Sequence, residues 1–222
     1  MRVDLPSGTP AELVLPDGGD LARALVIAPD VMGLRPLFDE MAARLADEQR
    51  WAVVAVEPFP GPDADLALPD RLGHRIDAER LTTDLQLGAD LVQERTGATK
   101  VGIIGFCMGG MNVFRAAGTG RFDRAVAFYG MIRPPEPWSA PGDDPLDALA
   151  RRECCPVLAI LGGADHFTPP QDIADLDAVG DHVTIQVYAD AEHGFVHDAS
   201  RPAHRPEDAA DAWRRTIAFL RG

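Results

Sequence analysis

Short apolar runs alternate with helix-length amphipathic segments through most of the chain, and this alternation restricts the fold more than any other feature. Runs typical of β-strands lie at residues 11–16, 23–30, 51–58, 100–106, 124–130, 156–163 and 183–190. Helical spacing of apolar residues appears at residues 36–50, 70–95, 107–117, 169–179 and 206–222. Strands that alternate with helices predict an α/β fold, with a mostly parallel sheet of about seven to eight strands and helices on both faces. The N-terminal strands, joined by short turns, are candidates for an antiparallel edge.

The length of the chain and the absence of linkers predict a single domain over residues 1–222. A chain of 222 residues can bury a sizeable core in one domain, and no internal repeat, low-complexity tract or interdomain linker interrupts it. The most irregular stretch, residues 133–145, is either a surface connection or a flap over a pocket.

The net charge and the number of cysteines limit the classes of binding partner and the cellular compartment that we expect. The formal net charge of −14 offers no basic surface for nucleic acid or for an anionic membrane. The three cysteines are Cys107 and the adjacent pair Cys154 and Cys155, and this odd, low count does not resemble a secreted disulfide framework. We interpret Cys154 and Cys155 as buried structural thiols. Because no apolar run resembles a signal peptide or a membrane span, we expect a cytoplasmic protein.

Residues 105–110 read GFCMGG and directly follow one of the apolar strands. The G-x-C-x-G pattern is that of a nucleophile elbow, with cysteine in the place of serine. Glycines flank the nucleophile because the turn is tight, and the N-terminus of the helix that follows favours a thiolate over a thiol. The pattern therefore predicts Cys107 as a nucleophile. The alternative is a buried cysteine beside a glycine-rich packing contact.

Candidates for a base and for an orienting carboxylate follow two later strands. Asp165 comes after the strand at 156–163, within LGGADHFTP, and His193 comes after the strand at 183–190, within YADAEHGF. Each alone has an ordinary explanation, since Asp165 suits a helix N-cap and His193 suits a loop. Their joint placement after separate parallel strands, where sites form, favours a Cys107–His193–Asp165 triad.

Three of these stretches together identify a family resemblance. GFCMGG, GGADHFTP and AEHGF, with VIAPDVMGL near the start, resemble the dienelactone hydrolase family of α/β-hydrolases over nearly the whole chain. The resemblance implies an α/β-hydrolase fold, with Cys107 as nucleophile, His193 as general base and then acid, and Asp165 as its orienter. It also implies an oxyanion hole from the backbone N–H groups of Met108 and Val31.

The resemblance further implies the reaction and its requirements. A cysteine hydrolase of this kind cleaves small carboxylic esters or lactones through an acyl-thioester intermediate, and it needs no metal and no organic cofactor. Its partner is a small-molecule ester or lactone. The sequence leaves the oligomeric state open between monomer and homodimer.

The chain departs from the family pattern at positions that concern the substrate. Asp30 stands where members carry an acidic residue, often glutamate, and is either an accessory catalytic group or a turn residue. His197 stands where the dienelactone-cleaving members carry a carboxylate-binding arginine, and a second arginine would be Arg71 or Arg75. Because histidine cannot reproduce the planar fork of arginine, we expect a neutral or differently charged small ester or lactone rather than dienelactone.

Several alternatives stay open at this point. A thioesterase could use the same triad, and a non-catalytic or redox-sensing relative could use Cys107 as a reactive thiol. A metal site from His193, His197, His204 and Asp198 is disfavoured, because this segment reads as a loop rather than a helix. Trp138, in the irregular stretch, is either a core or surface anchor or part of a pocket lining.

Overall fold

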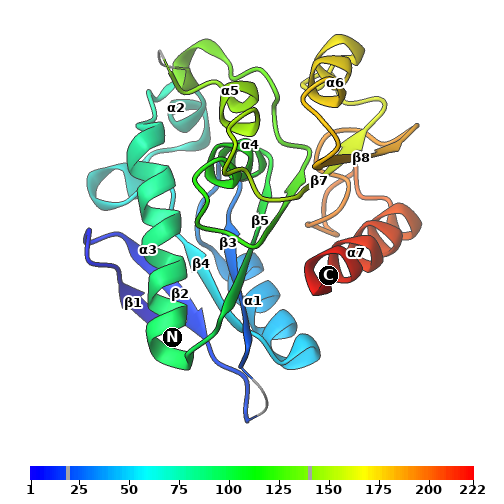
Figure 1. Cartoon of the computed structure of the whole chain (residues 1–222). Coiled ribbons are helices and arrows are strands. Elements are labelled where there is room, and N and C mark those ends of the chain that lie inside the picture. The colour runs from blue at the N-terminus through cyan, green and yellow to red at the C-terminus, as the bar shows by residue number, and fades with distance from the viewer. Residues whose placement is uncertain (19–20, 140–141) are drawn as a thin grey trace.

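A computed structural model describes residues 1–18, 21–139 and 142–222. These residues form one eight-stranded sheet in the order β1-β2-β4-β3-β5-β6-β7-β8 (Figure 1). The strands are β1 (Arg2–Asp4), β2 (Pro10–Val14), β3 (Arg23–Ala28), β4 (Ala52–Val56), β5 (Lys100–Phe106), β6 (Arg124–Phe128), β7 (Val157–Gly162) and β8 (Val183–Tyr188). The α-helices are α1 (Pro36–Gln49), α2 (Leu68–Gly73), α3 (Ala78–Thr96), α4 (Met108–Ala117), α5 (Pro145–Leu149), α6 (Pro170–Asp177) and α7 (Pro206–Arg221), with 3₁₀ turns at η1 (Gly61–Asp65) and η2 (Glu136–Trp138).

The sheet confirms the predicted α/β class and corrects its N-terminal edge. Strands β3 to β8 pair in parallel, whereas β1 pairs antiparallel with β2 and β2 antiparallel with β4. The antiparallel edge therefore consists of β2 and the unpredicted β1. Strand β3 lies between β4 and β5 in the interior, because its residues 24–28 are all buried and an edge position would expose them.

One helical prediction needs correction. The segment 70–95 is two helices, since α2 ends at Gly73 and Asp77 caps α3 by accepting a hydrogen bond from the Arg80 N–H. The irregular stretch 133–145 contains the turn η2 and leads into α5, while its residues 140–141 lie outside the described residues.

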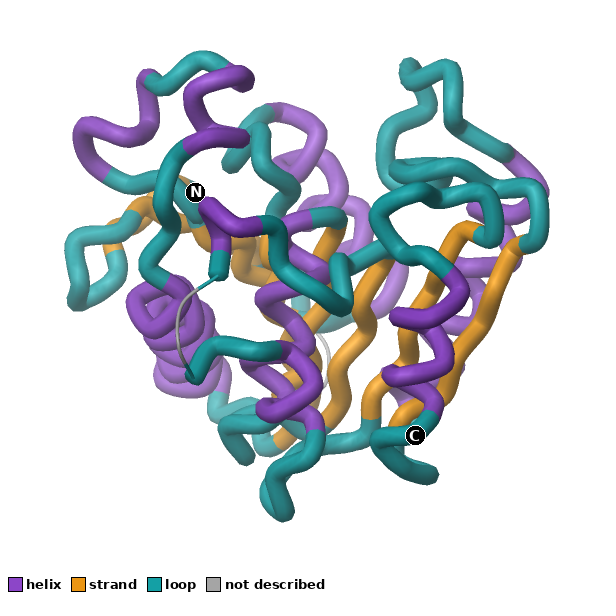
Figure 2. Tube along the Cα trace, turned by 90° about the horizontal axis from the view of Figure 1, so that it is seen from above, coloured by secondary structure: helices purple, strands orange, loops and turns teal. Residues whose placement is uncertain are grey.

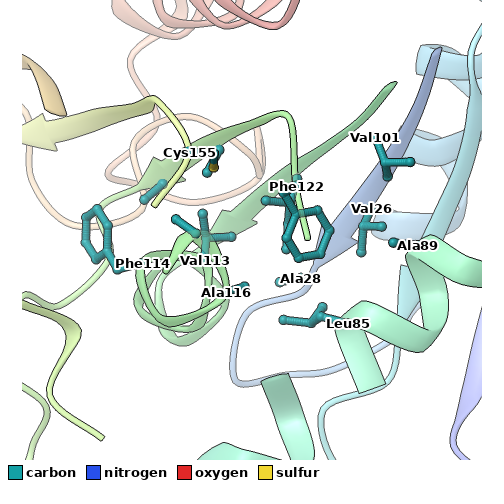
Figure 3. Close-up of a cluster of buried hydrophobic side chains, with 14 of the residues drawn as sticks. Val26, Ala28, Leu85, Ala89, Val101, Val113, Phe114, Ala116, Phe122 and Cys155 are labelled. Carbon is teal, nitrogen blue, oxygen red and sulfur yellow. The ribbon is translucent and has the colours of Figure 1, made fainter. Parts of the chain in front are cut away.

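Helices cover the two faces of the sheet (Figures 1 and 2), and two clusters of buried apolar side chains lie between the helices and the strands. On one face, α3, α4 and α6 pack on the strands, and Figure 3 shows Leu85 and Ala89 of α3, Val113 of α4 and Val26 of β3 as members of this cluster. On the other face, α1 and α7 contribute Phe38 and Ala212, among others. The helices leave the carboxyl ends of the strands open to loops, which is where parallel sheets place their sites. No helix in the described part of the chain has the length and apolar content to cross a membrane.

Candidate active site

Cys107 occupies a sharp turn between β5 and α4. Its backbone angles are φ 56° and ψ −118°, in a region that non-glycine residues rarely adopt. The turn is tied to the sheet, since the Cys107 N–H donates to the Phe128 carbonyl at 3.0 Å. A Cβ on Gly105 would lie 2.4 Å from the Gly109 carbonyl oxygen, and a Cβ on Gly109 would lie 2.1 Å from that of Ala28. Both glycines are therefore required by close backbone contacts, as the elbow pattern predicts.

His193 and Asp165 meet beside this turn although 28 residues separate them. His193 Nδ1 lies 2.8 Å from Asp165 Oδ2, and the Asp165 side chain is fully buried. This hydrogen bond sets the tautomer in which Nδ1 carries the proton, so that Nε2 is the nitrogen left for other chemistry. Nε2 is buried and has no hydrogen-bond partner within the described chain.

The electrostatics of His193 connect it to Cys107. Burial alone would lower the pKa of the imidazole, but Asp165 and Cys107 both favour the charged form and raise that pKa to about 9. Cys107 acts on the ring at close range, although its Sγ makes no well-aligned hydrogen bond with Nε2. The arrangement can therefore pass a proton between the thiol and the imidazole.

The backbone N–H groups of Met108 and Val31, which are predicted to form an oxyanion hole, donate no hydrogen bond to the described residues. Met108 is the first residue of α4, so its N–H has no partner within the helix. Val31 lies in the loop after β3, and its N–H donates no hydrogen bond to the described residues. Val31 and Met108 belong to one apolar cluster, against which Cys107 packs.

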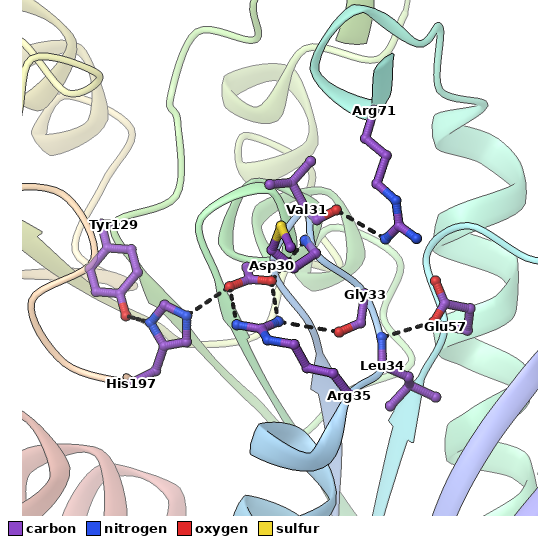
Figure 4. Close-up of polar contacts among 10 residues, drawn as sticks. Asp30, Val31, Gly33, Leu34, Arg35, Glu57, Arg71, Tyr129 and His197 are labelled. Atoms are coloured by element: carbon purple, nitrogen blue, oxygen red, sulfur yellow. Dashed lines mark hydrogen bonds and ion pairs between the residues drawn. The ribbon is translucent and has the colours of Figure 1, made fainter. Parts of the chain in front are cut away.

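The loop that carries Val31 is held in place by polar contacts (Figure 4). The Asp30 carboxylate accepts a hydrogen bond from the Met32 N–H at 2.9 Å, and the Asp30 carbonyl accepts one from the Gly33 N–H at 2.9 Å. Arg71 donates to the Val31 carbonyl at 3.3 Å. These contacts hold the backbone of Asp30 and Val31 in place.

Asp30 is committed to partners other than the thiol. Its two oxygens lie 2.6 and 2.9 Å from the guanidinium of Arg35, and one of them lies 2.8 Å from His197 Nε2. Burial would raise the pKa of Asp30, but His197 and Arg35 lower it well below its usual range. Asp30 makes no hydrogen bond to Cys107. Its direct contacts make it a support for the loop of Val31.

His197 lies inside the protein rather than at the mouth of the site. Its side chain is fully buried, and burial lowers the pKa of the imidazole despite the neighbouring Asp30. The Tyr129 O–H donates to Nδ1 at 2.5 Å, and Nε2–H donates to Asp30, as expected of a neutral ring (Figure 4). The expectation that His197 takes the place of a carboxylate-binding arginine is therefore corrected. The imidazole is buried and both of its nitrogens are hydrogen-bonded within the protein, so neither is left for a substrate.

The two candidate arginines have different environments. Arg71 is buried, donates to the carbonyls of Leu66, Ala64 and Val31, and lies over the Phe59 ring at 4.9 Å. Arg75 is exposed between α2 and α3 and forms no hydrogen bond or ion pair with the described residues.

Sequence reasoning missed an apolar wall that the structure brings to Cys107. Its members come from loops and helices far apart in the chain and are Val31, Phe59, Ile76, Leu81, Met108, Met111, Met131 and Trp138. Trp138 is 3% exposed and belongs to this cluster, so it is a buried core residue and not a surface anchor. No sequence signal marks the wall, because each residue looks like ordinary core. Among the described residues, no group of three or more His, Cys, Asp or Glu side chains is arranged to hold a metal ion.

Known proteins resemble this chain in sequence and in structure. The model of the dienelactone hydrolase family matches residues 10–222. A carboxymethylenebutenolidase of Pseudomonas putida is 27% identical over 90% of this chain and 85% of its own length. Carboxymethylenebutenolidase 2 of Cupriavidus pinatubonensis is 29% identical over 83% of this chain and 78% of its own length.

A solved structure supports the fold. It is that of a candidate dienelactone hydrolase of Klebsiella pneumoniae, which superposes with a TM-score of 0.85 at 24% identity and covers 99% of this chain and 97% of its own. The family match spans nearly all of the sequence, including the elbow and the loops that carry Asp165 and His193. The chain therefore belongs to the dienelactone hydrolase family, a family of hydrolases that act on lactone and ester bonds.

Proposed function

We propose that this protein hydrolyses small carboxylic esters or lactones through Cys107, His193 and Asp165, by way of an acyl-thioester. The observation that carries the proposal is the 2.8 Å bond from His193 Nδ1 to Asp165, which leaves Nε2 beside a cysteine on a strained elbow. Family membership supplies the reaction class, and this geometry supplies a nucleophile, a proton carrier and an orienting carboxylate.

The first half of the reaction acylates the enzyme. The Cys107 thiolate attacks the carbonyl carbon, and the N–H groups of Val31 and Met108 stabilise the oxyanion, each by roughly 2.7–4 kcal/mol at the transition state. The tetrahedral intermediate collapses as the bond to the leaving oxygen breaks. His193 gives its Nε2 proton to that oxygen, and the alcohol departs.

The second half releases the acid. In the acyl-enzyme, Cys107 is a neutral thioester, so it no longer raises the pKa of His193. The imidazole then takes a proton from water, and the resulting hydroxide attacks the thioester carbonyl. The second tetrahedral intermediate collapses, the carboxylic acid leaves, and the thiolate and imidazolium are restored.

This cycle predicts that blocking Cys107 lowers the pKa of His193. Carbamidomethylation with iodoacetamide makes the sulfur neutral, so the pKa should fall below its starting value of about 9, because burial then opposes Asp165 alone. At a pH between the two pKa values, the His193 ring would be charged before carbamidomethylation and neutral after it. An NMR titration of the imidazole measures both values.

Carbamidomethylation should be selective for Cys107 over the other two cysteines. Burial raises the pKa of Cys154 to about 11 and that of Cys155 to about 12, which makes both poor nucleophiles near neutral pH. The variant Cys154→Ala/Cys155→Ala serves as the control and should show the same shift. An unchanged His193 titration after modification of Cys107 would mean that the two side chains are not coupled.

The proposed intermediate is tested by trapping it. At about pH 5 the imidazole stays protonated and activates water poorly, so an activated aryl acetate should leave an acetyl group on the peptide that contains Cys107. Acid quench and peptide mass mapping locate the group. Acetylation of another residue during productive turnover would reject the thioester route. Comparison of matched oxygen esters and thioesters by kcat/KM separates an esterase from a thioesterase.

The buried and half-buried basic side chains near the site are bound to partners within the protein, which favours an uncharged substrate. His197 is enclosed, Arg35 is paired with Asp30, and Arg71 is bonded to three carbonyls. The wall beside Cys107 is apolar. The relatives named carboxymethylenebutenolidase act on a lactone by their names, and we propose that this chain takes a neutral ester or lactone instead of one that carries a carboxylate.

A further inference from the structure

Phe167 is an exposed aromatic ring that lies directly against His193. It is 46% exposed, and its centroid lies 4.8 Å from that of the imidazole with the two planes at 67°. His193 itself is mostly buried, with 11% of its side chain exposed. Phe167 therefore forms the solvent-facing side of the His193 environment.

The position of Phe167 is set by the same carboxylate that orients His193. Asp165 Oδ2 accepts the hydrogen bond from His193, and its Oδ1 accepts one from the Phe167 N–H at 2.9 Å. The Thr168 N–H also donates to the Asp165 carbonyl at 3.2 Å, which closes a tight turn. The ring is thus carried on a backbone that is fixed relative to the imidazole, as a specificity contact requires.

The direction of proton transfer decides which part of a substrate meets this ring. His193 delivers its proton to the leaving oxygen, so the leaving group must lie on the imidazole side of Cys107. The carbonyl oxygen would face Val31 and Met108, and the acyl group would lie toward the apolar cluster that contains these two residues. An apolar group attached to the leaving oxygen would cover the exposed part of the Phe167 ring.

We propose that Phe167 is a specificity-determining residue for the leaving group, and that the preferred substrates are neutral esters of aryl or alkyl-aryl alcohols. The inference rests on the proposed function, because it uses His193 as the proton donor. Binding would remove apolar surface of both the alcohol and the Phe167 ring from water. An aromatic alcohol would add an edge-to-face or stacked contact with that ring. A single exposed phenylalanine would be unremarkable elsewhere; its place beside His193 gives it this role.

A series of 4-alkylphenyl acetates tests the assignment. Lengthening the alkyl group from methyl to pentyl adds apolar area while the acidity of the phenol changes little. We expect kcat/KM of the wild type to rise about twofold per methylene, since such contacts would be about half buried, and to rise mainly through KM. Phe167→Ser should flatten this series, and Phe167→Leu should restore most of the slope.

Two controls separate recognition from a general effect. Val187→Ser changes another exposed apolar residue, 40% exposed on β8, and should leave the slope unchanged. A series of 4-nitrophenyl esters with lengthening acyl chains should keep its slope in Phe167→Ser. If Phe167→Ser instead lowers the rates of all esters by one factor, the ring only shields His193 from water and the proposal is wrong.

A measurement without turnover keeps the two proposals apart. 4-Pentylphenol should slow the carbamidomethylation of Cys107 in the wild type and several-fold less in Phe167→Ser, whether or not any ester is cleaved. Equal protection in both proteins would overturn the role of Phe167. Protection that depends on Phe167 in a protein without Cys107-dependent turnover would uphold the binding site for an aryl alcohol and reject the proposed hydrolysis.

Discussion

Cys107→Ala is expected to lower kcat/KM for activated aryl esters by about 10⁴-fold or more. The variant keeps the oxyanion N–H groups of Val31 and Met108 and the imidazole of His193, but it has no atom that can form the acyl bond. Water would have to attack directly, with only the residual help of oxyanion stabilisation. Steady-state kinetics on a 4-nitrophenyl ester measure the loss.

The matched control for this variant is Cys154→Ala. Cys154 lies before β7, makes its hydrogen bond with a neighbouring carbonyl and should leave kcat/KM unchanged when replaced. The melting temperature of Cys107→Ala should stay close to that of the wild type, because alanine keeps the same strained backbone and loses one half-buried sulfur. Undiminished turnover in Cys107→Ala would mean that the hydrolysis takes place elsewhere on the protein.

Gly109→Ala is expected to destabilise the protein by about 3 kcal/mol and to reduce activity as well. The new Cβ would lie 2.1 Å from the Ala28 carbonyl oxygen and 2.3 Å from that of Pro29. Both neighbours are backbone atoms in the interior, so the clash can be relieved only by moving α4 away from β3. That movement would separate Cys107 and Met108 from the loop of Val31.

Gly73→Ala is the matched control for this second effect. Gly73 is also a helical glycine, since it is the last residue of α2, and a Cβ there would meet no atom within 4 Å. Its replacement should be neutral or slightly stabilising, because alanine loses less conformational entropy on folding. Chemical denaturation compares the two variants. Equal stability of Gly109→Ala and Gly73→Ala would show that α4 and β3 are not in close contact.

Much of the fold follows from local patterns in the sequence. The interior strands are short apolar runs that cannot be exposed, and the helices between them repeat apolar residues at helical spacing, so the α/β class is a local consequence. The elbow is equally local, since the glycines of GFCMGG and the helix after them are adjacent in the chain. Asp165 and His193 could be placed because both follow strands, and parallel strands end at one edge.

The partners of the accessory residues could not be predicted in this way. Asp30 and His197 are 167 residues apart, and their bond depends on how two loops approach over the ends of β3 and β8. The burial of His197, the contact of Arg71 with Val31 and the ring of Phe167 against His193 likewise depend on side-chain packing between distant segments. Residue type and strand order thus specify which groups reach the site, whereas long-range packing specifies which of them face a substrate, because burial and hydrogen bonding are properties of the assembled structure.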